Sequence, residues 1–199
     1  MECIHDQHSS QRHKIKMPEL IRRLLYRIRR KYLLLRHPNL RMGYGTVVIG
    51  NFHLRGNGMI IFGDECRLEN VKLMIAGQLH IGRKVFLNGT SIVCKQLVTI
   101  NDECLVSDAY ITDTDFHNIE PELRRAPPGP RATRPIKIGR NVWIGDRGVV
   151  LKGSTIGNDS VIGSNSVVRG NVPDRVVCIG NPAMVVKNFD LPKPYISNS

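Results

Sequence analysis

Three side chains that lie close together in the sequence could move a proton: Asp113, Asp115 and His117, in the spacing D-x-D-x-H. Histidine is the side chain whose ordinary pKa lies nearest neutrality, so it can take a proton from a hydroxyl group as a general base. If the segment is a strand, the three side chains share one face, and either carboxylate could orient the imidazole ring. A backbone carbonyl could orient the ring equally well, and both aspartates could instead be surface or corner carboxylates.

The same spacing could hold a metal ion. No second cluster of His or Cys lies nearby, so we predict that no metal is required. His117 differs from the other histidines because a regular pattern ends there and a Pro- and Arg-rich stretch, residues 118–135, begins. A long loop on a regular scaffold usually carries function, which makes His117 a candidate catalytic base beside a protruding loop.

The elements that must position these residues repeat every six residues. From Ile138 the chain reads IGRNVW, IGDRGV, VLKGST, IGNDSV, IGSNSV and VRGNVP, with an aliphatic β-branched residue first in all six hexads. A period of six does not fit an α-helix, and it fits a short strand followed by a corner, with the aliphatic residue inside. An ordinary all-β sandwich with frequent turns is the alternative, and it does not explain so strict a period.

The pattern reaches back toward the N-terminus with slips of one residue. Cys66 and Cys104 take the small fifth position of their hexads, which predicts buried structural thiols. Lys72 fits an inward position poorly, so the register around residues 68–74 stays open. The five cysteines match neither a zinc site nor a redox pair, and we expect free thiols in a reducing compartment. In this earlier part of the pattern, the inward first position of each hexad is assigned to Phe62, Leu68, Ile75, Ile81, Leu87, Val93, Ile100 and Val106.

Residues 61–187 resemble the hexapeptide-repeat acyltransferases. The stretch 136–187 is similar to the C-terminal half of galactoside, maltose and exopolysaccharide O-acetyltransferases, and V-W-I-G at 142–145 with G-N-P-A-x-V-V-K at 180–187 indicates the acetyl-transferring branch. The segment TDTDFHNIEPELRR resembles a subgroup found among cell-surface polysaccharide enzymes. The resemblance implies an all-β, left-handed parallel β-helix, a homotrimer, acetyl-CoA as co-substrate, and His117 as general base beside a loop that reaches a neighbouring subunit.

The resemblance also implies where the substrates bind. It places an acceptor-binding role on Asn88, although Asn88 could equally be a corner residue in the left-handed conformation before Gly89. Asp113, Arg124 and Arg125 are the other expected acceptor contacts, and the two arginines could instead be solvated or touch the next subunit. The coenzyme groove is expected to involve Trp143, Asp146, Gly148 and Ser164, with Arg169 and Lys187 meeting nucleotide phosphates.

Positive charge is concentrated in the N-terminal part of the chain. Residues 1–41 hold eleven Lys and Arg against three acids, a net +8 of the total +12. Residues 19–36 are predicted to form a helix, and its apolar stripe could cap the open end of the coils, which we favour, or dock on an anionic membrane surface. No nucleic-acid motif is present, so nucleic acid is not an expected partner. The stripe consists of Leu20, Ile21, Leu24, Leu25, Ile28 and Tyr32.

The sequence therefore predicts four segments and one activity. The segments are a disordered tail (1–17), a basic amphipathic helix and connection (18–43), a β-helix with a loop at 118–135 (44–187), and a C-terminal tail (188–199). The activity is acetyl transfer to a saccharide hydroxyl in cell-surface polysaccharide biosynthesis. A cytoplasmic location, or the inner face of the membrane, is expected because no export signal or spanning apolar run is seen. N-acetylation of a nucleotide-linked amino sugar and a non-catalytic β-helix scaffold are the alternatives.

Overall fold

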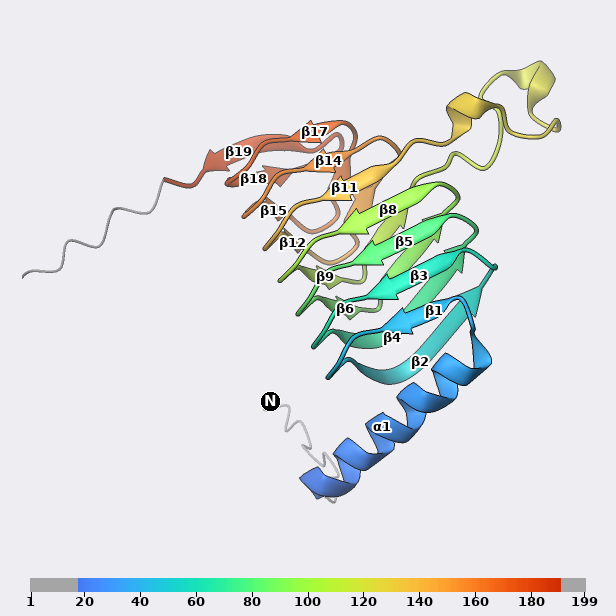
Figure 1. The fold of residues 1–199 in the computed structure, drawn as a ribbon. Coiled ribbons are helices and arrows are strands. Elements are labelled where there is room, and N and C mark those ends of the chain that lie inside the picture. Colours follow the sequence, from blue (N-terminus) through green and yellow to red (C-terminus); the bar gives the residue numbers. More distant parts are fainter. Residues whose placement is uncertain (1–17, 191–199) are drawn as a thin grey trace, which may run out of the picture.

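The computed structural model describes residues 18–190, in which one helix precedes a stack of coils built from short parallel strands (Figure 1). The expected tail at 1–17 and residues 191–199 of the expected C-terminal tail lie outside the described residues. Helix α1 (Glu19–Arg36) lies at one end of the stack, and β19 (Met184–Asn188) lies at the other. A loop that carries two short 3₁₀ helices, η1 (Pro121–Leu123) and η2 (Pro130–Ala132), projects from the side of the stack.

Each coil contributes strands to three faces in turn, and like strands pair in parallel along the axis. The first face consists of β1 (Leu40–Met42), β3 (Met59–Phe62), β5 (Gln78–Ile81), β8 (Leu97–Ile100), β11 (Ile136–Ile138), β14 (Thr155–Ile156) and β17 (Asn171–Val172). The second consists of the first halves of β2 (Val47–Arg55) and β4 (Arg67–Ile75), then β6 (Phe86–Asn88), β9 (Leu105–Ser107), β12 (Trp143–Ile144), β15 (Val161–Ile162) and β18 (Val176–Ile179). The third consists of the second halves of β2 and β4, then β7 (Ser91–Cys94), β10 (Tyr110–Thr112), β13 (Val149–Val150) and β16 (Val167–Val168).

The hexads place their side chains as their period predicts. The first-position residues of the six C-terminal hexads are at most 1% exposed, so they form the core of the prism. The fourth position turns the corner with a positive φ, at Asn141, Arg147, Asp159 and Asn165. The fifth position must be small where the coil closes on itself: a Cβ added at Gly148 would lie 2.7 Å from Cγ2 of Ile144. Buried serines take this position in later coils, at Ser154, Ser160 and Ser166.

In one strand of the earlier coils, β7, the residue that faces the core lies one position before the predicted residue. Val93 pairs with Met74, which is exposed, and it does not belong to the core cluster. Its neighbour Ile92 points inward instead, in line with Leu73. The register around Lys72, which the sequence left open, is also settled: Lys72 is exposed, because Val71 and Leu73 on either side of it face the core. The expectation that Val93 is an inward first-position residue is therefore wrong, because the spacing of seven allows either of two residues to face inward.

The predicted structural thiols are buried. Cys66 and Cys104 are 0% exposed, and the Sγ of each lies 3.0 Å from a carbonyl oxygen of the next coil, that of Gly82 and of Gly139 respectively. Burial raises the pKa of the Cys104 thiol to about 11, so the thiol keeps its proton at neutral pH. All four cysteines in residues 18–190 are free.

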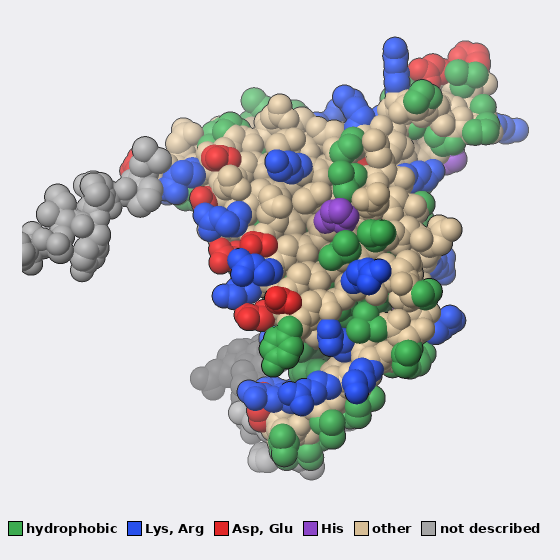
Figure 2. All heavy atoms as spheres, in the orientation of Figure 1, with side chains coloured by type: hydrophobic (Ala, Val, Ile, Leu, Met, Phe, Trp, Pro, Cys, Tyr) green, Lys and Arg blue, Asp and Glu red, His purple; other side chains and the backbone are tan. Residues whose placement is uncertain are grey.

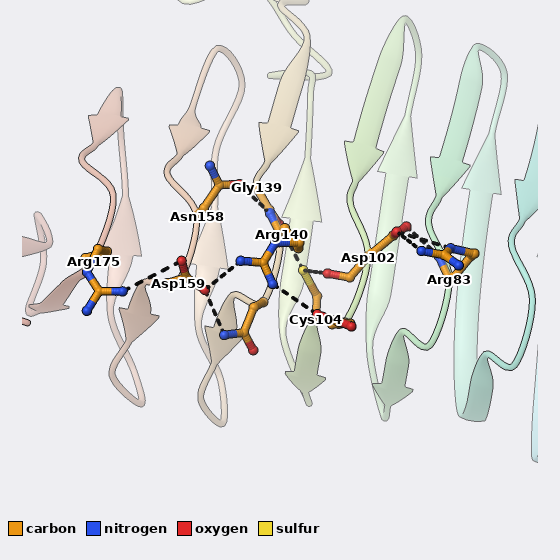
Figure 3. Close-up of polar contacts among 10 residues, drawn as sticks. Arg83, Asp102, Cys104, Gly139, Arg140, Asn158, Asp159 and Arg175 are labelled. Carbon is orange, nitrogen blue, oxygen red and sulfur yellow. Dashed lines mark hydrogen bonds and ion pairs between the residues drawn. The ribbon is translucent and has the colours of Figure 1, made fainter. Parts of the chain in front are cut away.

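The corner between the first and second faces is held by side chains from the following coil (Figure 3). Asp102 accepts the backbone N–H of Arg83 at 2.8 Å, and Asn158 accepts that of Arg140 at 2.8 Å. The guanidinium of Arg140 also pairs with Glu103 in the coil before and with Asp159 in the coil after. The Arg83 backbone N–H, with its guanidinium, holds the pKa of Asp102 below its ordinary value. Asp64 and Asp174 accept the backbone N–H groups of Tyr44 and Asn158 at the same corner of other coils.

Helix α1 lies across the first coil. The coils begin at β1, a few residues before residue 44, where the β-helix was expected to begin. Its contacts to that coil are both polar and apolar: Arg30 donates to the carbonyl oxygen of Met42 at 2.6 Å, Arg29 donates to that of Gly50, and Leu34 packs against the hydrophobic core. Leu33 is its one buried residue. Among residues 18–190, no helix combines the length and the apolar character needed to cross a membrane.

Candidate functional site

The loop leaves the third face after β10 and rejoins the first face at β11. Its two stems pair with each other: Thr114 bridges Thr133, the Asp115 N–H donates to the Ala132 carbonyl at 2.9 Å, and the Arg134 N–H donates to the Asp113 carbonyl at 3.0 Å. The loop is therefore an ordered excursion from one corner of one coil, as its composition predicts.

Asn118 organises the interior of the loop. Its amide nitrogen donates to the carbonyl oxygens of Leu123 and Pro127 at 2.8 and 3.1 Å, and its Oδ1 accepts the backbone N–H of Gly129 at 2.9 Å. A proline begins each of the two 3₁₀ helices, where its fixed φ suits the first helical position. These contacts fix the backbone that follows His117.

His117 lies between two hollows at the base of the loop. The first is an open pocket of about 450 Å³, lined by His117, Asp115 and Lys152 together with loop residues 118–120, 123, 129–132 and 134. The second is lined by His117, Pro121, Glu122, Arg124 and Arg125. The imidazole is exposed, and its ring nitrogens have no hydrogen-bond partner within residues 18–190. The ring is therefore available to a ligand or to another subunit.

Asp115 does not orient His117 within one chain. Its carboxylate forms an ion pair with Lys152, and Lys152 also donates to the carbonyl oxygen of Arg131 at 2.7 Å. The side chain of Lys152 is only 15% exposed, so the pair joins the loop to the following coil from inside the first pocket. Lys152 is not among the site residues predicted from the sequence. The signal that could have found it is its place at the same corner as the loop, one coil later, in the hexad VLKGST.

Asp113 also differs from the expectation. Strand β10 ends at Thr112, and the side chain of Asp113 turns inward, where it is 0% exposed. Its carboxylate accepts the backbone N–H groups of Lys95, Gln96 and Leu97 at 2.8, 2.7 and 3.0 Å. Asp113, Asp115 and His117 therefore do not share a strand face. Asp113 stabilises the corner of the preceding coil and is not placed to contact a saccharide acceptor. Burial, together with the charge of Asp113, raises the pKa of the Cys94 thiol to about 12.

Most of the residues expected to contact the coenzyme lie on other faces and corners than His117. Trp143 is 53% exposed on the second face, in an outward row with Phe86, Leu105 and Val161. Asp146, Gly148 and Ser164 lie at the corner between the second and third faces. Arg169 follows β16 at the loop's own corner, and Lys187 in β19 has its Nζ 5.5 Å from the centre of the Phe189 ring. A single chain therefore does not bring Trp143, or the corner with Asp146, Gly148 and Ser164, together with His117.

The expected acceptor residues divide in the same way. Arg124 and Arg125 line the second hollow beside His117, and Arg124 donates to the carbonyl oxygen of Ile119 at 3.3 Å. Asn88 ends β6 at the distant corner, and Gly89, not Asn88, takes the positive φ there, at +61°. Among residues 18–190, no three His, Cys, Asp or Glu side chains are grouped closely enough to hold a metal ion.

The repeat and the sequence around it are similar to those of known acetyltransferases. Residues 135–170 match the family model "Bacterial transferase hexapeptide (six repeats)". The chain is 38% identical over 113 residues to a galactoside O-acetyltransferase of Escherichia coli K12, which covers 56% of this chain and 55% of that one. It is 32% identical over 136 residues to a putative lipopolysaccharide biosynthesis O-acetyl transferase, WbbJ, of the same organism, covering 68% and 63%. The chain thus spans about half the length of the curated relatives it matches.

The fold is also found in solved structures. A hexapeptide-repeat acetyltransferase of Vibrio cholerae, complexed with acetyl-coenzyme A, superposes with a TM-score of 0.59 and 23% identity, covering 82% of this chain and 78% of that one. The predicted fold, a left-handed parallel β-helix of hexapeptide repeats with an N-terminal helix and a protruding loop, is confirmed. The predicted resemblance to hexapeptide-repeat acyltransferases is confirmed as well.

Proposed function

We propose that this chain is an acetyl-CoA-dependent O-acetyltransferase that acts on a saccharide hydroxyl, with His117 as general base. The observation that carries the proposal is the exposed imidazole of His117, without a partner in the described chain, at the base of an ordered loop and between two hollows. The similarity to a galactoside O-acetyltransferase over 113 residues supports the reaction and the class of acceptor.

The proposed reaction needs few groups. The acceptor hydroxyl oxygen attacks the thioester carbonyl carbon while a ring nitrogen of His117 takes the hydroxyl proton. The resulting tetrahedral intermediate collapses, the C–S bond breaks, and the thiolate of coenzyme A receives the proton from the imidazolium. The product is an acetyl ester. A neutral alcohol is a poor nucleophile, so the base contributes most of what the side chains add to this step.

The coenzyme would lie between two copies of the chain. The outward row with Trp143, and the corner with Asp146, Gly148 and Ser164, are separated from His117 in one chain. In a homotrimer, the His117 corner of one subunit would face the second face of its neighbour. The pantetheine arm would then pass along the exposed apolar row, and Arg169 and Lys187 would supply positive charge for the nucleotide phosphates. The loop residues Arg124 and Arg125 would contact the acceptor.

The proposed setting is cell-surface polysaccharide biosynthesis in the cytoplasm, where acetyl-CoA is the donor. The support is the similarity to the putative lipopolysaccharide biosynthesis O-acetyl transferase over 68% of this chain. The pocket of about 450 Å³ is of the size that holds a small ligand or one end of a larger one.

An acceptor screen tests the reaction. The full chain is incubated with acetyl-CoA and with galactosides, other neutral sugars and nucleotide-linked amino sugars, and the release of free thiol is followed with the product identified by mass. We expect thiol release that depends on a sugar hydroxyl and an ester that is cleaved by mild base. Release only with amino sugars, giving an amide, would make the enzyme an N-acetyltransferase. Failure to bind acetyl-CoA in calorimetry would favour a non-catalytic scaffold.

A subunit-mixing experiment tests the shared site. His117→Ala removes the base, and Trp143→Glu places a charge in the coenzyme groove. Each variant alone should have little activity. After unfolding and refolding together, mixed trimers should regain activity, because some sites pair an intact His117 with an intact Trp143 from the neighbour. No recovery, with trimers confirmed by sizing, would contradict a site shared between two chains.

A further inference from the structure

The apolar stripe of α1 faces away from the solenoid. At about 3.6 residues per turn, its members fall within one arc of the helix, and Leu35 extends that arc. All seven are between 46% and 86% exposed. The opposite side, which includes Arg29, Arg30 and Leu33, packs on the first coil. The arc, here called the outer face, is formed by Leu20, Ile21, Leu24, Leu25, Ile28, Tyr32 and Leu35.

This arrangement differs from what a capping helix needs. A helix that only closes the end of a stack of coils would turn its apolar side toward the core. Here the side that touches the coil contributes Leu33 to the core and is also fixed by guanidinium groups that donate to the carbonyl oxygens of Met42 and Gly50, while the long apolar stripe faces outward. The apolar side is left uncovered by residues 18–190 along a helix about 27 Å long. Exposed apolar surface of this extent marks a contact site.

The charge around the outer face identifies the kind of partner. Helix α1 carries seven Lys and Arg against Glu19, a net charge of +6. Glu19 pairs with Arg22 and Arg23, whereas Arg27, Lys31 and Arg36 have no acidic partner within 4.0 Å among residues 18–190. Figure 2 shows Lys and Arg side chains in a row along the lower end of the molecule, with hydrophobic side chains beyond them at its outer edge.

A second copy of the same helix would bring the same cations together, so it is a poor occupant of this face. A surface with an apolar interior and negative headgroups matches both features: the headgroups meet the cations, and the apolar arc enters the boundary below them. We propose that α1 docks in the plane of a membrane that carries anionic phospholipid, with its outer face inserted and the β-helix held above the surface.

Vesicle sedimentation tests the proposal with the full chain and without any substrate. The vesicles are phosphatidylcholine alone, or phosphatidylcholine with about 30% phosphatidylglycerol. We expect sedimentation with the anionic vesicles only, and a decrease when salt is raised. The double variant Leu24→Asp with Ile28→Asp should lower the bound fraction at least about tenfold. Both side chains are more than half exposed, so the variant should keep its melting temperature.

Two control variants sharpen the result. Met184→Asp places the same charge on a residue that is 65% exposed at the other end of the stack, and it should bind vesicles as the parent does. Lys31→Glu changes a cation that does not hold α1 to the coil, and it should weaken binding several-fold.

Two outcomes would overturn the proposal. One is that the parent chain does not sediment with anionic vesicles. The other is that the Leu24/Ile28 variant binds them as well as the parent; a change of oligomeric state in that variant, with no vesicle binding by the parent, would assign the outer face to a second copy. Acetyl transfer to a soluble acceptor is measured separately, so failure of the docking proposal and failure of the proposed enzyme activity can be told apart.

Discussion

The regular coils at residues 136–179 and the loop with its stems at residues 113–135 use similar residues in different ways. In the coils, position in the hexad determines direction: the first residue points inward and the fourth turns the corner. In the loop stem, three polar residues at alternating positions take three different directions. Asp113 is buried and accepts backbone N–H groups, Asp115 pairs with Lys152, and His117 is exposed between two hollows.

The difference shows what a repeat contributes. Where the pattern repeats, every coil is held by its neighbours, so a side chain's direction follows from the pattern. Where the repeat is interrupted, the hexad pattern no longer sets the direction, and individual polar contacts with the neighbouring coils decide it for Asp113 and Asp115. Substitutions in the two regions should therefore affect different measurements.

The largest expected effect belongs to the loop. His117→Ala should lower kcat for acetyl transfer by about 10²–10⁴-fold, because the hydroxyl then attacks without a base. Stability should not change, since the imidazole has no hydrogen-bond partner in the described chain. Steady-state kinetics and thermal melting check both parts. His53→Ala, which removes an exposed imidazole from β2, is the matched control and should leave kcat unchanged. Full turnover in His117→Ala would contradict the proposed base.

The next effect belongs to the coils. Ile156→Ala should lower the free energy of unfolding by about 2–5 kcal/mol, because it leaves a cavity in the core of the prism. Ile156 is 1% exposed, and its neighbour Thr155 in the same strand is exposed. Thr155→Ala should therefore change the free energy by no more than about 0.5 kcal/mol. Urea unfolding gives both values. Equal effects at the two positions would contradict the assigned direction of the strand.

Asp113 offers a direct test of the boundary between the two regions. Asp113→Ala removes the acceptor of three part-buried backbone hydrogen bonds, which should cost about 1–3 kcal/mol of unfolding free energy. Once the protein is folded, KM for the acceptor should change little, since the carboxylate faces the coil. Unfolding and kinetic measurements separate these effects. A normal stability with a large rise in KM would instead restore Asp113 as an acceptor contact.

The sequence predicted the coils well because each inward position is tested many times along the repeat. It could not fix Val93, because a coil with one extra residue can place that residue on either side of the strand. It could not predict the Asp115–Lys152 pair either, because the two residues meet only after the loop closes on itself between them. The apolar stripe of α1 was correctly located, but a stripe does not show which side of the helix meets the solenoid; Leu33, Arg29 and Arg30 make that contact on the opposite side.

The smallest expected effect concerns the pair that joins the loop to the next coil. Asp115→Asn and Lys152→Met should each lower the free energy of unfolding modestly, and a double-mutant cycle should give a coupling of about 0.5–1 kcal/mol. Lys137→Met, a substitution of an exposed lysine on β11 without an acidic partner within 4.0 Å among residues 18–190, should show no coupling to Asp115. If the pair only fixes the loop, both single variants should change kcat to the same small extent. A fall in kcat for Asp115→Asn that approaches that of His117→Ala, with Lys152→Met unaffected, would instead show that Asp115 turns to the imidazole in the assembled enzyme.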